Sequence, residues 1–358
     1  MGLRSPVVGV HYPGDLAAVR SWFPGDAACL DYLDWLRWPE GFWCPHCGGR
    51  QGWRLPAGGW SCGRCRRRVR PLAGTIFQDT RTPLTVWFEA AWLMAVTKNG
   101  VSAASLQPLL GLGSYETAWA MCHKLRTAMG RTSADLLSGD VEVDETFIGG
   151  VKTGGKRGRG APGKAFVVVA VEIKAKGFGR CRLQVVEKID AVHLGTFLHA
   201  TIAPGSVIIS DALNSYPLAI ADTYGHNAFN IKRLGFHAHE VLPGVHRVAS
   251  LLKRWLEGTH QSGVSTDHLQ AYLNEFTFRF SVVIKAVVVV VGEGGARGGN
   301  PLWTMGTRWR ASRSACGPLR EGSTRRCSDG SGATRRLEEC RSSQSRVCVR
   351  SPHGLCAA

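Results

Sequence analysis

Apolar residues in the first part of the chain recur every three or four positions, as they do on one face of a helix. The pattern predicts a helix over residues 26–37, with Asp26 as its cap. A second helix is expected after Thr82, its cap, and two shorter ones are expected to begin at Ser102 and Ser114. Short helices joined by glycine-rich turns favour a helix-turn-helix module.

The last of these helices carries basic residues that could reach DNA. We expect it to offer His123, Lys124 and Arg126 to the DNA, as a recognition helix does. A plain helical linker is the alternative interpretation, because three-helix patterns are common.

The pattern changes to that of strands near residue 140. Three consecutive strands, a helix, a fourth strand and a later helix predict an α/β domain. The expected strands cover residues 140–150, 164–174, 179–189 and 206–213, and the expected helices cover residues 190–202 and 246–257.

Four cysteines have the spacing of a zinc site. Cys44 and Cys47 form one C-x2-C pair, Cys62 and Cys65 form another, and fourteen residues separate the pairs. Each pair can present two thiolates to one tetrahedral zinc, and the segment between the pairs reads as a short hairpin. The sequence therefore predicts a zinc ribbon that depends on its metal for folding.

The charge of the chain favours a polyanionic partner. Lys and Arg number 44 against 27 Asp and Glu, which gives a formal net charge of +17. Contacts of such side chains with phosphates release counterions from nucleic acid, although a solvated basic surface is the alternative. Five basic residues also lie among glycines in residues 149–164, where the backbone could follow a phosphate chain or form a solvated loop. They are Lys152, Lys156, Arg157, Arg159 and Lys164.

Neither a signal peptide nor a membrane-spanning stretch is apparent in the sequence. We therefore expect a cytoplasmic protein, associated with the nucleoid and without a membrane partner. The twelve cysteines include the zinc-type quartet and others that are scattered or gathered near the C-terminus, which indicates a reduced compartment rather than disulfides.

Two aspartates stand where metal-binding carboxylates are found in α/β sheets. Asp144 lies on the first expected strand, and Asp211 ends the apolar run "VIIS". If the two strands are neighbours, both carboxylates face one point at the edge of the sheet where ligands gather. Like charges that close need a cation between them, and Mg²⁺ or Mn²⁺ suits an all-oxygen site. Either aspartate alone could instead be a turn or cap residue.

The ordered motifs of the chain resemble those of bacterial insertion-sequence transposases of the ISXO type, members of the DDE superfamily with an N-terminal zinc ribbon. The resemblance covers roughly residues 20 to 280. The stretches that carry it are "RWPEGFWCPHCGG", "GTIFQDTRTPLTVWF", "GSYETAWAMCHKLRTAM", "VEVDETFIGG", "SDALNSY" and "GTHQSGVSTDHLQAYLNEFTFRF".

The resemblance implies an RNase H-like catalytic domain behind two smaller modules and ahead of an atypical tail. The tail lacks helical or strand periodicity and reads as a frameshifted, disordered segment, with an evolved basic DNA-binding tail as the alternative. The expected parts are a zinc ribbon with its preceding helix (20–72), a helical DNA-binding module (73–135), the catalytic domain (138–280) and the tail (281–358).

The same resemblance implies a catalytic site with one departure from the family pattern. Asp144 and Asp211 match the first two catalytic acids, which would hold Mg²⁺ or Mn²⁺. Relatives are described as using Asp, Asp, Asn and a Lys for catalysis. This chain has Leu251 where that Asn stands, and it retains the Lys as Lys253. In more distant relatives a Glu stands at the position of His246, so His246 is a second candidate for the third catalytic position; a packing or capping role is the alternative.

The expected function is therefore that of a DNA transposase, which cleaves the ends of its element and joins them to target DNA. Its partners would be the transposon ends, the target and at least one further copy of itself, because two ends must be brought together. The alternative is a catalytically inactive zinc-ribbon DNA-binding protein derived from a transposase.

Overall fold

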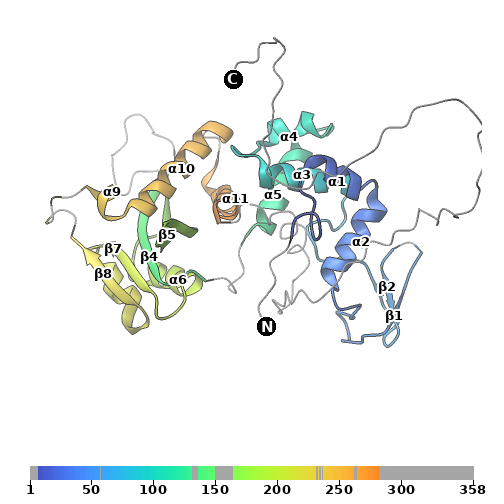
Figure 1. The fold of residues 1–358 in the computed structure, drawn as a ribbon, viewed down its shortest axis with the longest axis horizontal. Coiled ribbons are helices and arrows are strands. Elements are labelled where there is room, and N and C mark those ends of the chain that lie inside the picture. The colour runs from blue at the N-terminus through green and yellow to red at the C-terminus, as the bar shows by residue number, and fades with distance from the viewer. Residues whose placement is uncertain are drawn as a thin grey trace, which may run out of the picture. The chain divides into compact units, whose positions relative to one another are not determined.

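The computed structural model (Figure 1) describes residues 7–56, 58–130, 136–149, 164–230, 233, 235, 237–261 and 264–281. The expectations for Lys152 to Arg159 and for the tail beyond Ser281 lie outside these residues. The described parts are a helical core, a small three-stranded sheet, and a five-stranded sheet covered by helices. Among the helices of the described residues, none is both long enough and apolar enough to span a membrane.

Five helices share one apolar core in the N-terminal part of the chain. They are α1 (Leu16–Trp22), α2 (Asp26–Arg37), α3 (Leu84–Val96), α4 (Ala103–Leu109) and α5 (Tyr115–Ala128). The expected caps Ser102 and Ser114 are confirmed, because their side chains accept hydrogen bonds from the backbone N–H groups of Ser105 and Thr117. The helix predicted over residues 26–37 has those bounds in the structure.

Two expected helix caps are wrong. Asp26 is the first residue of α2, and its Oδ1 accepts from the backbone N–H groups of Leu84 (2.8 Å) and Thr85 (3.3 Å). Asp26 therefore caps α3 rather than its own helix. Pro83, and not Thr82, occupies the N-cap position of α3. The acceptor that α3 needs comes from a tertiary contact, which the local sequence does not reveal.

The hairpin expected between the two cysteine pairs is present. Three antiparallel strands form this small sheet, and Trp38 and Phe42 pack with the cysteines beneath it. Asp34 of α2 attaches the sheet to the helical core, since its carboxylate accepts from Arg54 Nη2 and Trp60 Nε1, both at 2.6 Å. The strands are β1 (Gly52–Arg54), β2 (Trp60–Cys62) and β3 (Arg68–Val69).

A five-stranded mixed sheet organises the rest of the described chain. Its order is β6-β5-β4-β7-β8; β5 is antiparallel to both β4 and β6, whereas β7 is parallel to β4 and β8. The α/β prediction is thereby confirmed. The strands are β4 (Asp140–Ile148), β5 (Ala165–Lys174), β6 (Gly177–Val186), β7 (Val207–Asp211) and β8 (Gly225–Phe229).

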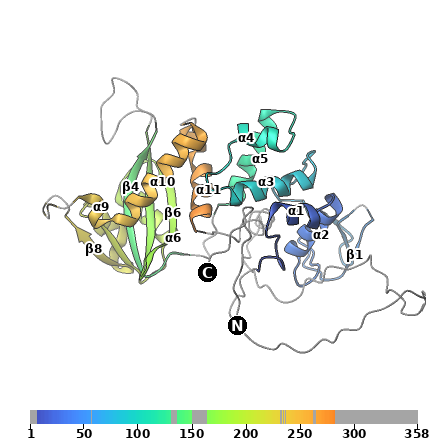
Figure 2. The same cartoon turned by 45° about the horizontal axis from the view of Figure 1, so that its top comes forward.

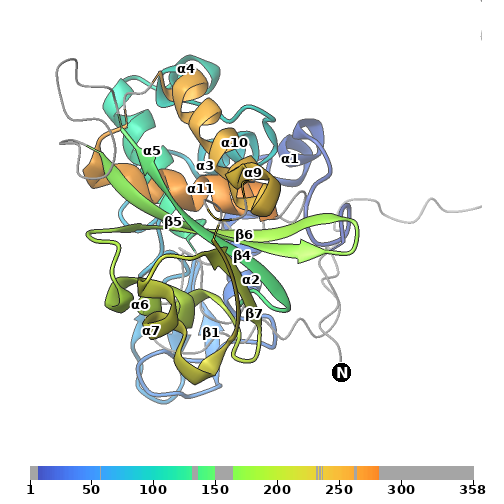
Figure 3. The ribbon, with the colours of Figure 1, turned by 90° about the vertical axis from the view of Figure 1, so that its left-hand side faces the viewer.

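Helices cover both faces of this sheet (Figure 3). On one face lie α6 (Ala191–Thr201) and α7 (Ser215–Ile220), which bury Val141 and Val143 of β4. On the other lie α10 (Pro243–His260) and α11 (Leu269–Ser281). Three short helical turns, α9 (Ala238–Val241), η1 (Ala221–Thr223) and η2 (Thr266–His268), complete the described elements. α10 runs beside β4 (Figures 1 and 2), which places its side chains next to the acidic strand.

Candidate functional site

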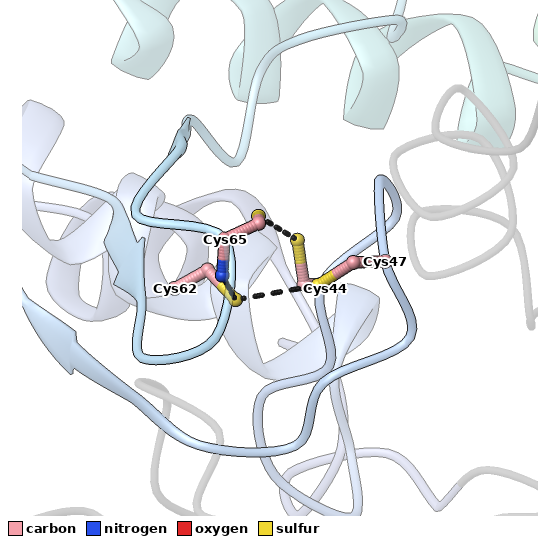
Figure 4. Close-up of side chains that lie close together, drawn as sticks. All are labelled: Cys44, Cys47, Cys62 and Cys65. Carbon is pink, nitrogen blue, oxygen red and sulfur yellow. Dashed lines mark hydrogen bonds between the residues drawn. The ribbon is translucent and has the colours of Figure 1, made fainter.

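The four cysteines of the ribbon converge on one point (Figure 4). Their Sγ atoms all lie within 4.8 Å of one another, with Cys44 3.7 Å from Cys65 and Cys47 3.6 Å from Cys62. A tetrahedral zinc with Zn–S distances of about 2.3 Å holds its sulfur atoms about 3.8 Å apart. The quartet therefore has the geometry of a structural zinc site.

Each cysteine pair sits on a tight turn of the same design. Gly48 N–H donates to the carbonyl of Cys44, and Arg66 N–H donates to the carbonyl of Cys62. Both donors have positive φ, 70° for Gly48 and 57° for Arg66, so the second turn holds a non-glycine residue in the left-handed region. Hydrogen bonding from the Cys65 N–H lowers the pKa of the Cys62 thiol to about 6, which favours the thiolate that binds metal.

Asp144 and Asp211 lie on neighbouring parallel strands, as the sequence predicts for a shared site. The register pairs Asp140 with Val207 and Glu142 with Ile209. The recorded pairing ends there, two residues before Asp144 and Asp211 on their strands. Val141, Val143 and Ile208 face α6 and α7, so the alternation of side chains turns both aspartates to the face that α10 covers. Asp211 is also the last residue of β7. The two aspartates therefore lie on adjacent strands and share one face of the sheet.

The described residues do not assemble these acids into a complete ligand shell. The cysteine quartet is the one group of three or more His, Cys, Asp or Glu side chains there whose ligand atoms all lie within 4.8 Å. A set of Asp144, Asp211 and His246 does not meet that limit.

A pocket of about 520 Å³ opens beside Asp144. One wall is β4 from Asp144 to Thr146, and the other is a face of α10 that extends from Val245 to Glu257. Asp211 is absent from the lining residues. The α10 face is mixed in charge, because His246, Lys253 and Arg254 line it together with Glu257.

His246 is the helix side chain that the structure places next to Asp144. Its Nε2 lies 3.8 Å from Asp144 Oδ2, is buried, and has no hydrogen-bond partner among the described residues. Burial lowers the pKa of His246, and the positive charges of His239 and Lys253 lower it further. A neutral imidazole with a buried, unpaired nitrogen is suited to a metal ion or a phosphate oxygen.

Leu251 lies away from this pocket. It packs against the apolar cluster between the sheet, α10 and α11, whereas Ser250 and Lys253 line the pocket. On a helix, residue 251 is about 100° around from residue 250, which turns it toward the core. The spacing of His246, Ser250, Lys253 and Glu257 could have indicated the pocket-lining face from the sequence alone.

The expectation that Arg126 contacts DNA is wrong. Its side chain is 1% exposed, and Arg126 Nε lies 2.7 Å from Oε2 of the fully buried Glu275. His123 is half-buried and its ring lies against Trp119, with the ring centroids 4.0 Å apart. Of the three basic residues, Lys124 alone is exposed. The helical pattern showed the basic face but not the partner that covers it.

Two families of domains match this chain. Residues 136–281 match the ISXO2-like transposase domain, and residues 24–68 match the transposase zinc-ribbon domain. An uncharacterized protein in the transposable element ISH50 of Halobacterium salinarum is 24% identical over 285 residues, which are 74% of this chain and 93% of that protein. The zinc-ribbon match and the sulfur geometry together identify the quartet as a structural zinc site. With a zinc ribbon ahead of an ISXO2-like domain, the chain belongs to the insertion-sequence transposases of the ISXO type.

Proposed function

We propose that residues 138–280 form an RNase H-like catalytic domain that cleaves the ends of an insertion sequence and transfers them to target DNA. The observation that supports this proposal is the parallel pairing of β4, which carries Asp144, with β7, which ends in Asp211. A mixed sheet with helices on both faces supports the fold that the family resemblance implies.

Asp144 and Asp211 would hold Mg²⁺ or Mn²⁺, because two carboxylates on adjacent strands and on one face of a sheet suit a hard cation. When bound, such metals activate the attacking oxygen and stabilise the leaving oxygen of a phosphate diester. His246, with its unpaired Nε2 toward Asp144, would meet the same metal or a phosphate oxygen. Lys253, on the pocket wall, would neutralise phosphate charge as the DNA enters.

The zinc ribbon would hold DNA beside the catalytic domain. Its turn from Arg64 to Arg68 carries four exposed arginines, and Arg66 lies over the exposed ring of Trp53. Guanidinium groups bind phosphates, and exposed aromatic rings stack on bases. Joining two transposon ends would further require at least two copies of the chain.

The test is Mn²⁺-dependent nicking of a duplex that contains the DNA flanking the gene. We expect Asp144→Asn to lower the nicking rate of the full chain by about 100-fold or more, since a carboxylate that contacts the metal is lost. Asp140→Asn is the matched control, because Asp140 is an exposed residue of the same strand. Equal rates for Asp144→Asn and the parent would refute the proposed metal site.

A catalytically inactive DNA-binding protein is the second candidate function. The observation that favours it is that, among the described residues, Asp144, Asp211 and His246 do not form a cluster whose ligand atoms all lie within 4.8 Å of one another. Under this function the chain would bind the flanking duplex, but neither the parent nor Asp144→Asn would nick it. The nicking assay therefore separates the two candidates when it is run beside a binding assay.

A further inference from the structure

Helix α10 begins without a cap of its own. Its N-cap residue, Leu242, has no side-chain acceptor, and Pro243 at the first helical position has no N–H. The first hydrogen bond within the helix is the one that the backbone N–H of His246 donates to the carbonyl of Leu242, at 3.2 Å. The N–H groups of Gly244 and Val245 therefore need an acceptor from another element.

Glu142 of β4 supplies that acceptor. Its Oε2 accepts from the backbone N–H of Val245 at 3.0 Å, and its side chain is buried. Burial raises the pKa of Glu142, while the N–H groups of Val245 and Gly244 act in the opposite direction. A carboxyl group at this end of a helix also interacts favourably with the helix dipole.

The contact is close enough that a side chain at position 244 would displace its neighbours. A Cβ there would lie 2.9 Å from Glu142 Oε2 and 2.8 Å from the ring of Phe178, which is too near for either atom. Gly258, near the other end of the same helix, has nothing within 4 Å of such a Cβ. The start of α10 is thus the place where this helix is fitted to the sheet.

The same contact sets the geometry of the candidate catalytic pocket. Glu142 and Asp144 are two residues apart on one strand, so they project from the same face. Val245, which Glu142 holds, precedes His246, whose Nε2 lies 3.8 Å from Asp144 Oδ2. Lys253 lines the pocket two turns further along the helix.

We infer that Glu142 is a positioning residue, which fixes the start of α10 and thereby holds His246 and Lys253 at their places beside Asp144. Its effect on cleavage rests on the proposed function. Its effect on α10 rests on the observed contacts alone, so the two can be tested separately.

The first measurement is amide hydrogen exchange in the full chain. We expect Glu142→Ala to speed exchange at residues 244–246 by about tenfold, the effect of losing a helix cap, and Glu142→Gln to preserve most of the protection because its amide oxygen still accepts. Gly244→Ala should speed exchange at the same amides while keeping every charge. Gly258→Ala, the matched glycine control, should leave them unchanged.

The second measurement is single-turnover Mn²⁺-dependent nicking. We expect Glu142→Ala and Gly244→Ala to nick about 10- to 100-fold more slowly with unchanged DNA affinity, because small displacements of reacting groups have effects of this size. Glu142→Gln should nick at close to the parent rate. Glu172→Ala controls for the loss of a buried carboxylate, since Glu172 bonds to Arg180 and Ser138 rather than to α10.

Protection at residues 244–246 that is unchanged in both Glu142→Ala and Gly244→Ala would overturn the inference. So would parent-like nicking by both variants, or equal losses in Glu142→Gln and Glu142→Ala. If Glu142→Ala does not fold, Gly244→Ala decides through both measurements. If the parent itself does not nick DNA, the proposed function fails, and hydrogen exchange alone decides whether Glu142 positions α10.

Discussion

Three of the four acidic residues of β4, Glu142, Asp144 and Glu145, have different partners although they lie within four positions. Glu142 receives the N–H of Val245, Asp144 borders the pocket beside His246, and Glu145 accepts from the hydroxyl of Tyr216 on the other side of the sheet at 2.9 Å. The strand period predicts that Asp144 and Glu145 point to opposite faces. Their partners come from helices far along the chain, which the period cannot reveal.

The family resemblance and the structure lead to different expectations for position 251. Because Leu251 packs against the core, we expect Leu251→Asn to leave nicking within about threefold of the parent and to lower the free energy of unfolding by about 1–2 kcal/mol through partial burial of an amide. Nicking assays and urea denaturation of the full chain measure the two effects.

The family pattern leads to the opposite expectation for this substitution. If the asparagine that relatives carry at this position were the missing catalytic group, Leu251→Asn would raise nicking by about 100-fold. Ser250→Asn is the matched variant, because residue 250 lines the pocket one position away. A higher nicking rate with Leu251→Asn and an unchanged rate with Ser250→Asn would show that α10 presents a different face to the pocket in the active state.

Elements with a strong apolar period were predictable from the sequence, whereas several of their ends were not. The helix over 26–37 has the predicted bounds. The strand expected over 206–213 is present but ends at Asp211, and α10 begins at Pro243 rather than at 246. The α10 start depends on Glu142 and the α3 start on Asp26, and both are contacts between elements distant in sequence. Local sequence patterns indicate which face of a helix is buried. They do not indicate which distant side chain accepts hydrogen bonds from the N–H groups at the start of that helix.

The cap of α3 provides a direct test of this distinction. We expect Asp26→Ala to lower the free energy of unfolding by about 0.5–2 kcal/mol, because two N–H groups of α3 lose their acceptor. Thr82→Ala should change it by less than about 0.5 kcal/mol, although Thr82 is the cap that the sequence suggests. Urea denaturation compares them, and a larger loss with Thr82→Ala would contradict the observed capping.

The folding of the zinc ribbon should depend on its metal. Its own apolar core is small, with Trp38, Phe42 and Val69 as its buried residues apart from cysteines. We therefore expect one zinc per chain in the parent and loss of that zinc in Cys62→Ser, with unfolding confined to the ribbon. Metal analysis and hydrogen exchange over residues 44–69 measure this, and Cys29→Ser, at a buried cysteine outside the quartet, is the control.

At the scale of the whole molecule, a buried ion pair joins the helical core to the helices that cover the five-stranded sheet. Arg126 of α5 pairs with Glu275 of α11, and the Arg126 guanidinium also lies 4.0 Å from the ring of Tyr272. Arg279, one turn after Glu275, donates to the carbonyls of Thr97 and Lys98, both at 2.6 Å. Polar contacts therefore bind the helical core to α11, and their loss should affect both.

We expect Arg126→Met to lower the free energy of unfolding by about 3–5 kcal/mol, because it leaves the Glu275 carboxylate buried without its main counter-charge. Adding Glu275→Leu should recover most of that loss, since no unpaired carboxylate then remains buried between α5 and α11. Urea denaturation of the four proteins of this double-mutant cycle measures the coupling. A double variant no more stable than Arg126→Met would show that packing, and not charge, stabilises the contact between α5 and α11.

The pH dependence of the stability of Arg126→Met provides a second test of the ion pair between Arg126 and Glu275. Burial raises the pKa of Glu275 and Arg126 opposes that rise, so removing Arg126 should raise the pKa further above the unfolded value. A carboxyl group with a raised folded-state pKa stabilises the fold when protonated, and this contribution is lost as the pH rises through that pKa. We therefore expect Arg126→Met to be closer to the parent in stability at pH 5 than at pH 8. A deficit that is the same at pH 5 and pH 8 would mean that Glu275 is already neutral in the parent, and that the buried contact with Arg126 is not an ion pair.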